Sequence, residues 1–202
     1  MYDKLNGSLV FCLLSACTCS QLPSAKPRFS IERHSEHSAK TGPGLLPRPH
    51  QLEAVKAGVE AFSNGERRAS IVMPGGSGKT LTGLYLIEQL HRHADFGPLR
   101  RVLVLLPRRL LVDQTLREYE RAASVRLRML RVHSGVSGGI PAPEAIAQWL
   151  KGAGDGCVSV VLSTYHSSQD VSIACGLLGK GQKGFGLCIF DEVCLSPSRL
   201  PS

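Results

Sequence analysis

A glycine-rich loop that ends in a lysine and a threonine follows a short apolar segment. The stretch from Ser70 to Thr80 reads SIVMPGGSGKT. Glycines allow successive backbone N–H groups to converge on an anion, and a helix that begins at the loop adds the positive end of its dipole. Lys79 can then reach the β- and γ-phosphates of a nucleoside triphosphate, and the hydroxyl of Thr80 can bind Mg²⁺. The pattern therefore predicts ATP and Mg²⁺ as cofactors. The expected nucleotide-binding residues of the loop are Gly75, Gly76, Ser77, Gly78, Lys79 and Thr80.

The alternative is an ordinary glycine-rich turn that contains a lysine by chance. The apolar, strand-like segment before the loop and the helical pattern after it favour nucleotide binding. Met73 occupies a place where the full phosphate-loop pattern has glycine or alanine. That departure is small, and the loop remains the first candidate site.

Two adjacent carboxylates, Asp191 and Glu192, follow the apolar run 187–190. In sheets with parallel strands, ligands gather where the strands end. An aspartate there can hold Mg²⁺, usually through water, and the next glutamate can polarise the water that attacks the γ-phosphate. Since buried carboxylates are costly without a cation, the pair favours a function over a plain strand end. We therefore assign Asp191 to the metal, and Glu192 with Lys79 to catalysis.

Strand and helix patterns alternate from residue 45 onward. Strands are expected at 69–73, 101–107, 127–132, 158–163 and 187–190, and helices at 49–63, 81–90, 110–122 and 143–151. The strands read as continuous apolar runs, which is typical of strands buried on both faces. This alternation predicts an α/β fold, a mainly parallel sheet with helices on both faces.

Length and charge limit the alternatives. The 202 residues suffice for one domain with a sizeable core. The net charge is +8, and the segment 100–131 contributes +6 of it through nine arginines against three acids. A polyanion is a plausible partner, but arginines on helix faces can also be simply solvated, so the charge alone does not decide.

The first 44 residues differ from the remainder. Residues 9–17 are apolar but too short to span a bilayer, and they resemble a weak targeting segment. Residues 21–44 are rich in Ser, Pro, Arg and Lys and show no periodicity, so we expect residues 1–44 to form a disordered leader. Seven scattered cysteines indicate buried apolar side chains in a reducing compartment, and no structural metal is expected. Since the apolar run 9–17 is too short to span a bilayer, no membrane partner is expected either. An intracellular location is expected, and an organelle is left open.

Several segments together resemble superfamily 2 helicases and translocases, in the branch of type III restriction-enzyme motor subunits and DEAH-box-like proteins. The resemblance covers residues 45–192. Its segments are Arg48-Pro49-His50-Gln51, the loop Met73–Thr80, the run 104–114 (VLLPRRLLVDQ) and Ser163–Ser167 (STYHS). In this family a non-glycine at the position of Met73 is common. The family role of the glutamine, reading the adenine edge, comes to Gln51 by resemblance.

The resemblance also implies a fold and a partner. It implies a first RecA-like domain at residues 45–192, incomplete at its C-terminus, followed by a non-matching tail at 193–202. A second RecA-like domain, which supplies arginines to the γ-phosphate in the family, is missing from this chain. Nucleic acid is the implied partner, DNA in preference to RNA. The contacts carried over are Arg108, Arg109, Thr164 and Tyr165, with helix capping and strand-end packing as the alternative role of these residues, above all of Tyr165.

Two classes of function remain open. The first is the ATP-binding domain of an ATP-dependent nucleic-acid helicase or translocase, a fragment with little activity alone. The second is a non-catalytic module that binds nucleotide or nucleic acid without turnover. Nucleic-acid-stimulated phosphate release that is abolished by Lys79→Ala distinguishes the two.

Overall fold

Six parallel strands form one sheet in the computed structural model, which describes residues 9–15, 45–97, 99–135, 140–152, 156–179 and 184–191. The strands are β1 (Leu9–Ser15), β2 (Arg68–Met73), β3 (Arg101–Leu106), β4 (Leu127–Val132), β5 (Val158–Thr164) and β6 (Leu187–Asp191). Their order across the sheet is β2-β1-β6-β3-β5-β4, and every neighbouring pair is parallel. The predicted parallel α/β fold is thereby confirmed.

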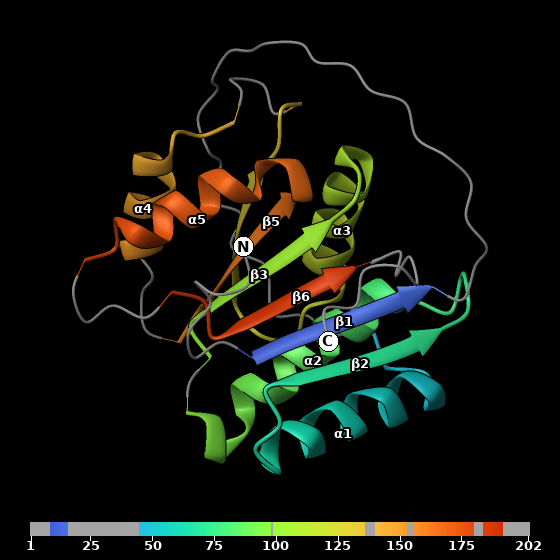
Figure 1. Ribbon diagram of the computed structural model, residues 1–202. Helices are drawn as coiled ribbons and strands as arrows, with labels where there is room; N and C mark the ends of the chain where they lie inside the picture. The colour runs from blue at the N-terminus through green and yellow to red at the C-terminus, as the bar shows by residue number, and fades with distance from the viewer. Residues whose placement is uncertain are drawn as a thin grey trace, which may run out of the picture.

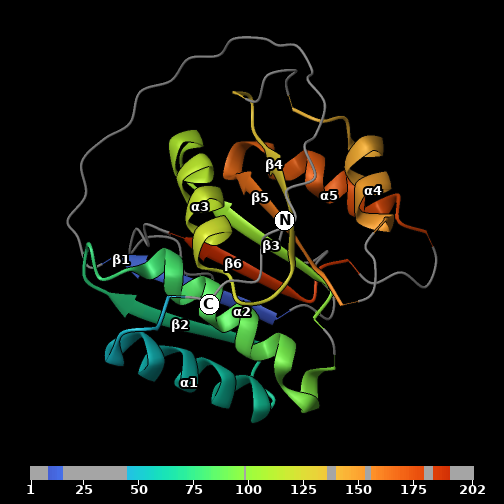
Figure 2. The same cartoon turned by 180° about the vertical axis from the view of Figure 1, so that it is seen from behind.

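Helices cover both faces of this sheet (Figures 1 and 2). They are α1 (Pro49–Ser63), α2 (Lys79–Arg92), α3 (Arg109–Ala122), α4 (Pro143–Lys151) and α5 (Ser168–Gly176). One core cluster joins α1, α2 and α3 to one face, and a second joins α4 and α5 to the other. Short 3-10 turns at Ala94–Phe96 and Tyr165–Ser167 complete the described elements. None of the helices in the described ranges is long and apolar enough to cross a membrane.

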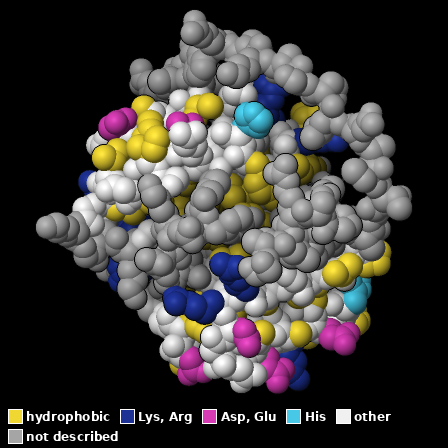
Figure 3. All heavy atoms as spheres, in the orientation of Figure 1, with side chains coloured by type: hydrophobic (Ala, Val, Ile, Leu, Met, Phe, Trp, Pro, Cys, Tyr) yellow, Lys and Arg dark blue, Asp and Glu magenta, His cyan; other side chains and the backbone are white. Residues whose placement is uncertain are grey.

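The strands β3, β5 and β6 are buried along nearly their whole length. Continuous apolar runs are what a strand covered on both faces requires. β2 differs, because it lies at an edge of the sheet and its Val72 is 65% exposed. Figure 3 shows hydrophobic side chains over the middle of the face that carries α4 and α5.

The expectation that residues 1–44 form a disordered leader is wrong for residues 9–15. This segment forms β1, an interior strand hydrogen-bonded to β2 on one side and β6 on the other. Phe11 is fully buried and Leu13 is 1% exposed. A short apolar run satisfies the pattern of a targeting segment and that of a buried strand equally, and here its side chains complete the core. The remaining leader residues 1–8 and 16–44, like the tail 193–202, lie outside the described residues.

Candidate functional site

The phosphate loop connects the carboxyl end of β2 to the first turn of α2. Gly76 and Gly78 have φ values of 72° and 89°, a left-handed backbone that glycine adopts without strain. Gly78 is the N-cap of α2 and provides no side-chain cap, and the start of a helix is where backbone N–H groups can meet an anion. The positions of Gly75 and Gly76 are open, because a Cβ at either would meet nothing within 4 Å. The loop is thus open around Gly75 and Gly76.

The side chains of the loop converge on one carbonyl. Lys79 Nζ donates to the Pro74 carbonyl at 3.2 Å, and Ser77 Oγ donates to the same oxygen at 2.7 Å. Both side chains therefore lie over the loop, and Ser77, Lys79 and Thr80 are all partly exposed. The predicted loop residues are all brought together at the start of α2.

Gln51 lies against this loop from α1. Its Nε2 donates to the Gly78 carbonyl at 3.0 Å, and its Oε1 accepts from the Arg48 N–H at 2.8 Å. His50 Nε2 lies 3.0 Å from the Ser77 carbonyl. Gln51 is only 2% exposed. In this structure both ends of the Gln51 amide are used within the protein, so Gln51 ties the start of α1 to the phosphate loop.

Gly78 should tolerate no side chain, whereas Gly75 should. A Cβ at Gly78 would contact Gln51 Nε2, and its φ of 89° disfavours any other residue. We expect Gly78→Ala to lower the free energy of unfolding by about 1–3 kcal/mol, from the left-handed backbone and this contact. Gly75→Ala is the matched control and should change it little. Urea unfolding of both variants measures the difference, and equal values would contradict the loop geometry.

Asp191 is the last residue of β6 and lies where the strands end, as the phosphate loop does after β2. It is 7% exposed, and its backbone carbonyl accepts a hydrogen bond from Tyr165 Oη at 2.9 Å. Only β1 separates β6 from β2, which corresponds to two strand spacings, about 10 Å. Burial, and to a lesser extent the Asp191 carboxylate, raise the pKa of Tyr119, which lines the same region from α3. Glu192, the predicted partner of Asp191, lies outside the described residues.

All six strands are parallel, so their carboxyl ends lie together along one side of the sheet, its carboxyl-terminal edge. In spatial order the strands lead to the phosphate loop (β2), Asp191 (β6), Arg108 and Arg109 (β3), Thr164 and Tyr165 (β5) and His133 (β4). The predicted nucleotide residues therefore occupy one half of the edge, and the predicted nucleic-acid residues occupy the other.

Among the predicted nucleic-acid residues, only the two arginines face solvent. Arg108 and Arg109 are exposed at the start of α3. Thr164 is 6% exposed, and its Oγ1 caps the following turn by accepting from the Ser167 N–H at 3.4 Å. The Tyr165 ring stacks on Phe190 with centroids 6.4 Å apart. In this structure, Thr164 and Tyr165 have the capping and packing roles that were the alternative.

A buried histidine at the end of β4 was missed by the sequence analysis. His133 is 1% exposed, and its Nδ1 accepts from the Gly135 N–H at 3.1 Å. Its Nε2 faces Asp113 Oδ1 at 3.5 Å, and the same oxygen accepts from Arg131 at 2.8 Å. Burial lowers the pKa of His133, against the opposing effect of Asp113. The strand-end rule that identified Asp191 would also have identified His133 after Val132.

Acidification should destabilise the protein through His133. Because the pKa of His133 is lowered in the folded state, the unfolded state binds more protons between that lowered pKa and the ordinary value of 6.5. The free energy of unfolding should fall from about pH 6.5 downward, by up to ~1.4 kcal/mol per pH unit for this group. His133→Asn should flatten this slope, and His166→Asn, at an exposed position, should not. Equal slopes in the two variants, measured by urea unfolding between pH 7 and 5, would contradict the assignment.

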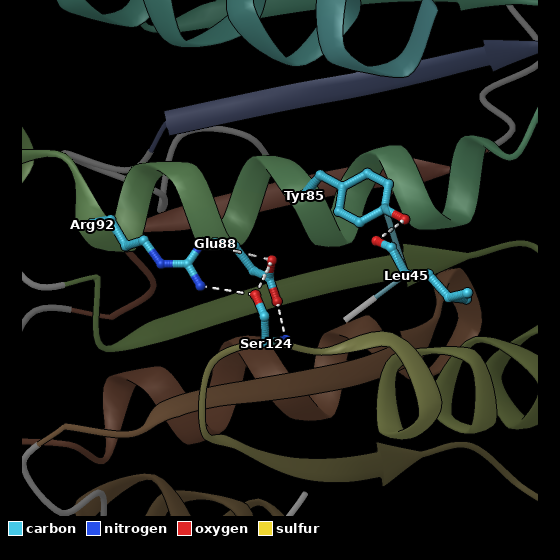
Figure 4. A network of polar contacts seen from close by, with 5 residues as sticks. All are labelled: Leu45, Tyr85, Glu88, Arg92 and Ser124. Carbon is cyan, nitrogen blue, oxygen red and sulfur yellow. Dashed lines mark hydrogen bonds and ion pairs between the residues drawn. The ribbon is translucent and has the colours of Figure 1, made fainter. Parts of the chain in front are cut away.

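A groove of about 790 Å³ lies between residues 45–47, α1 and α2, away from the predicted site residues. Figure 4 shows its polar side, where Glu88 of α2 accepts from the Ser124 N–H and from Ser124 Oγ at 2.7 Å. Arg92 pairs with the same carboxylate at 3.8 Å, and Tyr85 Oη donates to the Leu45 carbonyl at 2.9 Å. These partners compensate the burial of the Glu88 charge. No predicted site residue lines the groove.

The chain is similar to known restriction enzymes. The sequence profile of the family "Type III restriction enzyme, res subunit" matches residues 44–197. The chain is 36% identical over 105 residues to the Type I restriction enzyme EcoAI endonuclease subunit of Escherichia coli, an alignment that covers 52% of this chain and 12% of that protein.

Two solved structures share the fold. A nuclease-deletion mutant of the Type ISP restriction-modification enzyme LlaGI, in complex with a DNA substrate mimic, has a TM-score of 0.58 and 22% identity over 71% of this chain and 17% of its own. The ATP-dependent Type ISP enzyme LlaBIII, bound to DNA, has a TM-score of 0.57 and 19% identity over 73% of this chain and 13% of its own. The chain therefore spans a small part of each relative. Since the family profile covers most of the chain, the protein belongs to the type III restriction enzyme res-subunit family and carries its superfamily 2 helicase-like domain.

Proposed function

We propose that this chain is the ATP-binding part of an ATP-dependent DNA helicase or translocase. The observation that carries the proposal is the arrangement at the carboxyl ends of the strands, where the phosphate loop and Asp191 have only β1 between them and the exposed Arg108 and Arg109 follow the next strand, β3. Family membership and the ATP-dependent, DNA-bound relatives support the same conclusion.

The residues present fit a magnesium-bound triphosphate. The open positions at Gly75 and Gly76 and the uncapped start of α2 provide backbone donors for phosphate oxygens. Thr80 and Asp191 provide the hydroxyl and carboxylate oxygens that Mg²⁺ prefers. Bound Mg²⁺ would neutralise charge on the phosphates during transfer. An ordinary turn would need none of these features together.

Each site residue has a distinct proposed role. Lys79 Nζ, which now bonds the Pro74 carbonyl, would exchange this acceptor for phosphate oxygens. Gln51 would hold the loop from α1, in addition to the adenine contact implied by the family resemblance. Glu192 would orient the attacking water. An arginine that reaches the γ-phosphate contributes about a thousandfold or more in related phosphoryl-transfer enzymes, so the rate of turnover depends on whether such an arginine meets this site.

A direct test separates the enzyme from a non-catalytic module. The purified chain is titrated with Mg-ATP, and phosphate release is followed with and without duplex DNA. DNA-stimulated release supports the ATPase. Binding of Mg-ATP without any release supports the module, and the absence of Mg-ATP binding would overturn the ATPase and leave only a module that binds nucleic acid. A parallel titration with RNA tests the preference for DNA.

The arginines at the start of α3 should determine DNA affinity without reading sequence. Arg108 and Arg109 are exposed, so they can reach backbone phosphates. We expect the double variant Arg108→Gln, Arg109→Gln to weaken DNA binding equally for unrelated sequences and to reduce the slope of log affinity against log salt by about 1–2. Arg117→Gln with Arg121→Gln, in the same helix but farther from its start, is the control. An unchanged salt slope in the first variant would contradict the role.

A further inference from the structure

The strand β1 lies between the two strands that carry the halves of the nucleotide site. It is parallel to both, and its register places Leu13 beside Asp191 of β6 and Ser15 beside Met73 of β2. Figure 1 shows β1 between β2 and β6. The carboxyl end of β1 therefore lies between the phosphate loop, which follows β2, and Asp191, the proposed metal ligand at the end of β6. Residues 9–15 precede the family match at 44–197, so this strand is supplied from outside the matched region.

The phosphate-loop strand is joined to the sheet through β1. β2 is at the edge of the described sheet, and β1 is its neighbour there. The backbone ladder from β2 to β6 consequently passes through β1, with six register pairs on one side and five on the other. If β1 leaves, β2 loses its hydrogen-bonded partner and the two halves of the site lose their fixed separation.

The side chains of β1 also contact both helices beside the loop. Phe11 packs against Gly58 of α1, where a Cβ would lie 3.0 Å from its ring, and its ring meets Phe62 edge-on at 6.3 Å. Leu13 lies against Gly83 of α2, where a Cβ would lie 3.5 Å from Leu13 Cδ1. Gly83 is one helical turn after Lys79, so Leu13 supports the helix that presents the lysine.

From these contacts we propose that β1, the segment Leu9–Ser15, is a working part of the nucleotide site and that Leu13 is a positioning residue for Lys79 and Asp191. The inference rests on the proposed ATP site and adds an element outside the matched region to it. Release of β1 would disassemble the site, and by reciprocity bound Mg-ATP holds β1 in the sheet.

Hydrogen exchange measures this coupling directly. In a strand whose opening abolishes binding, Mg-ATP at a hundred times its dissociation constant should slow amide exchange of residues 9–15 by about a hundredfold. Exchange of these residues that is equally fast with and without bound Mg-ATP would overturn the inference while leaving the proposed function intact. Absence of Mg-ATP binding by the unmodified chain would contradict the proposed function, and the nucleotide role of β1 with it.

A matched pair of variants distinguishes positioning from general stability. Leu13→Ala in β1 and Leu130→Ala in β4 each truncate a leucine that is at most 2% exposed, but β4 is at the opposite edge of the sheet from β2. Both variants should lose stability. At a temperature where both remain folded, only Leu13→Ala should weaken Mg-ATP binding, by about tenfold. Equal weakening in the two variants would show that β1 contributes stability alone and would overturn the positioning role.

Discussion

Lys79→Ala should reduce DNA-stimulated phosphate release by at least about a hundredfold, which is the usual effect of removing one electrostatic contact to a transition state. The lysine is the first residue of α2, and its ammonium group lies over the loop at the Pro74 carbonyl. Removal of this cation leaves the phosphate charge to the backbone N–H groups and Mg²⁺ alone. The readouts are phosphate release with and without duplex DNA and the affinity for Mg-ATP.

Two controls make the Lys79→Ala result specific. The hydrogen bond from Lys79 to Pro74 is exposed, so its loss should change the free energy of unfolding by no more than about 1 kcal/mol. Lys79→Arg keeps the charge but replaces a compact ammonium with a planar fork, and it should restore only part of the activity. Turnover in Lys79→Ala equal to that of the unmodified chain would show that the lysine does not meet the phosphates.

Much of the fold follows from patterns that are local in the sequence. The predicted strand 127–132 and helix 143–151 coincide with β4 and α4, and the other predicted strands and helices that follow residue 45 are within a few residues of their observed bounds. These segments have strong apolar patterns and clear breakers at their ends. The helix α5 was not predicted, because Ser168–Gly176 mixes polar, small and apolar residues and buries few apolar side chains, Val171 and Ala174 among them.

The order of the strands could not be predicted in this way. The sequence specifies that the run 9–17 is apolar, but its place between β2 and β6 depends on pairing with residues more than fifty positions away. A targeting segment and an interior strand need the same composition, so the choice between them requires the tertiary structure. The same limit explains why residues 9–15 were assigned to the leader.

Only part of the candidate site could be predicted from local sequence patterns. The phosphate loop and Asp191 are recognisable because each motif is continuous and the strand-end rule places both at one edge. The orientations of Gln51 and Thr164 depend on tertiary hydrogen bonds, to the Gly78 carbonyl and the Ser167 N–H respectively. A motif therefore predicts where a residue lies, whereas the direction of its side chain follows from the packing around it.

Phe11→Ala should lower the free energy of unfolding by about 3–5 kcal/mol, the usual cost of emptying an aromatic core position. Phe11 is fully buried, and its ring fills the space beside Gly58 and Phe62. A residue of a disordered leader would contribute almost nothing, so this variant tests the position of β1 without nucleotide. Urea unfolding followed by circular dichroism measures the change.

Leu46→Ala, at a position 90% exposed, is the control for Phe11→Ala and should change the free energy of unfolding by less than about 0.5 kcal/mol. A double-mutant cycle between Phe11→Ala and Phe62→Ala adds a second criterion, because the edge-on ring pair should give a coupling energy of about 0.5–1.5 kcal/mol. If the effects of the two substitutions are additive, the result would contradict the contact between β1 and α1. If Phe11→Ala changes the free energy of unfolding no more than Leu46→Ala does, residues 9–15 lie outside the core. The assignment of β1 as an interior strand would then be wrong.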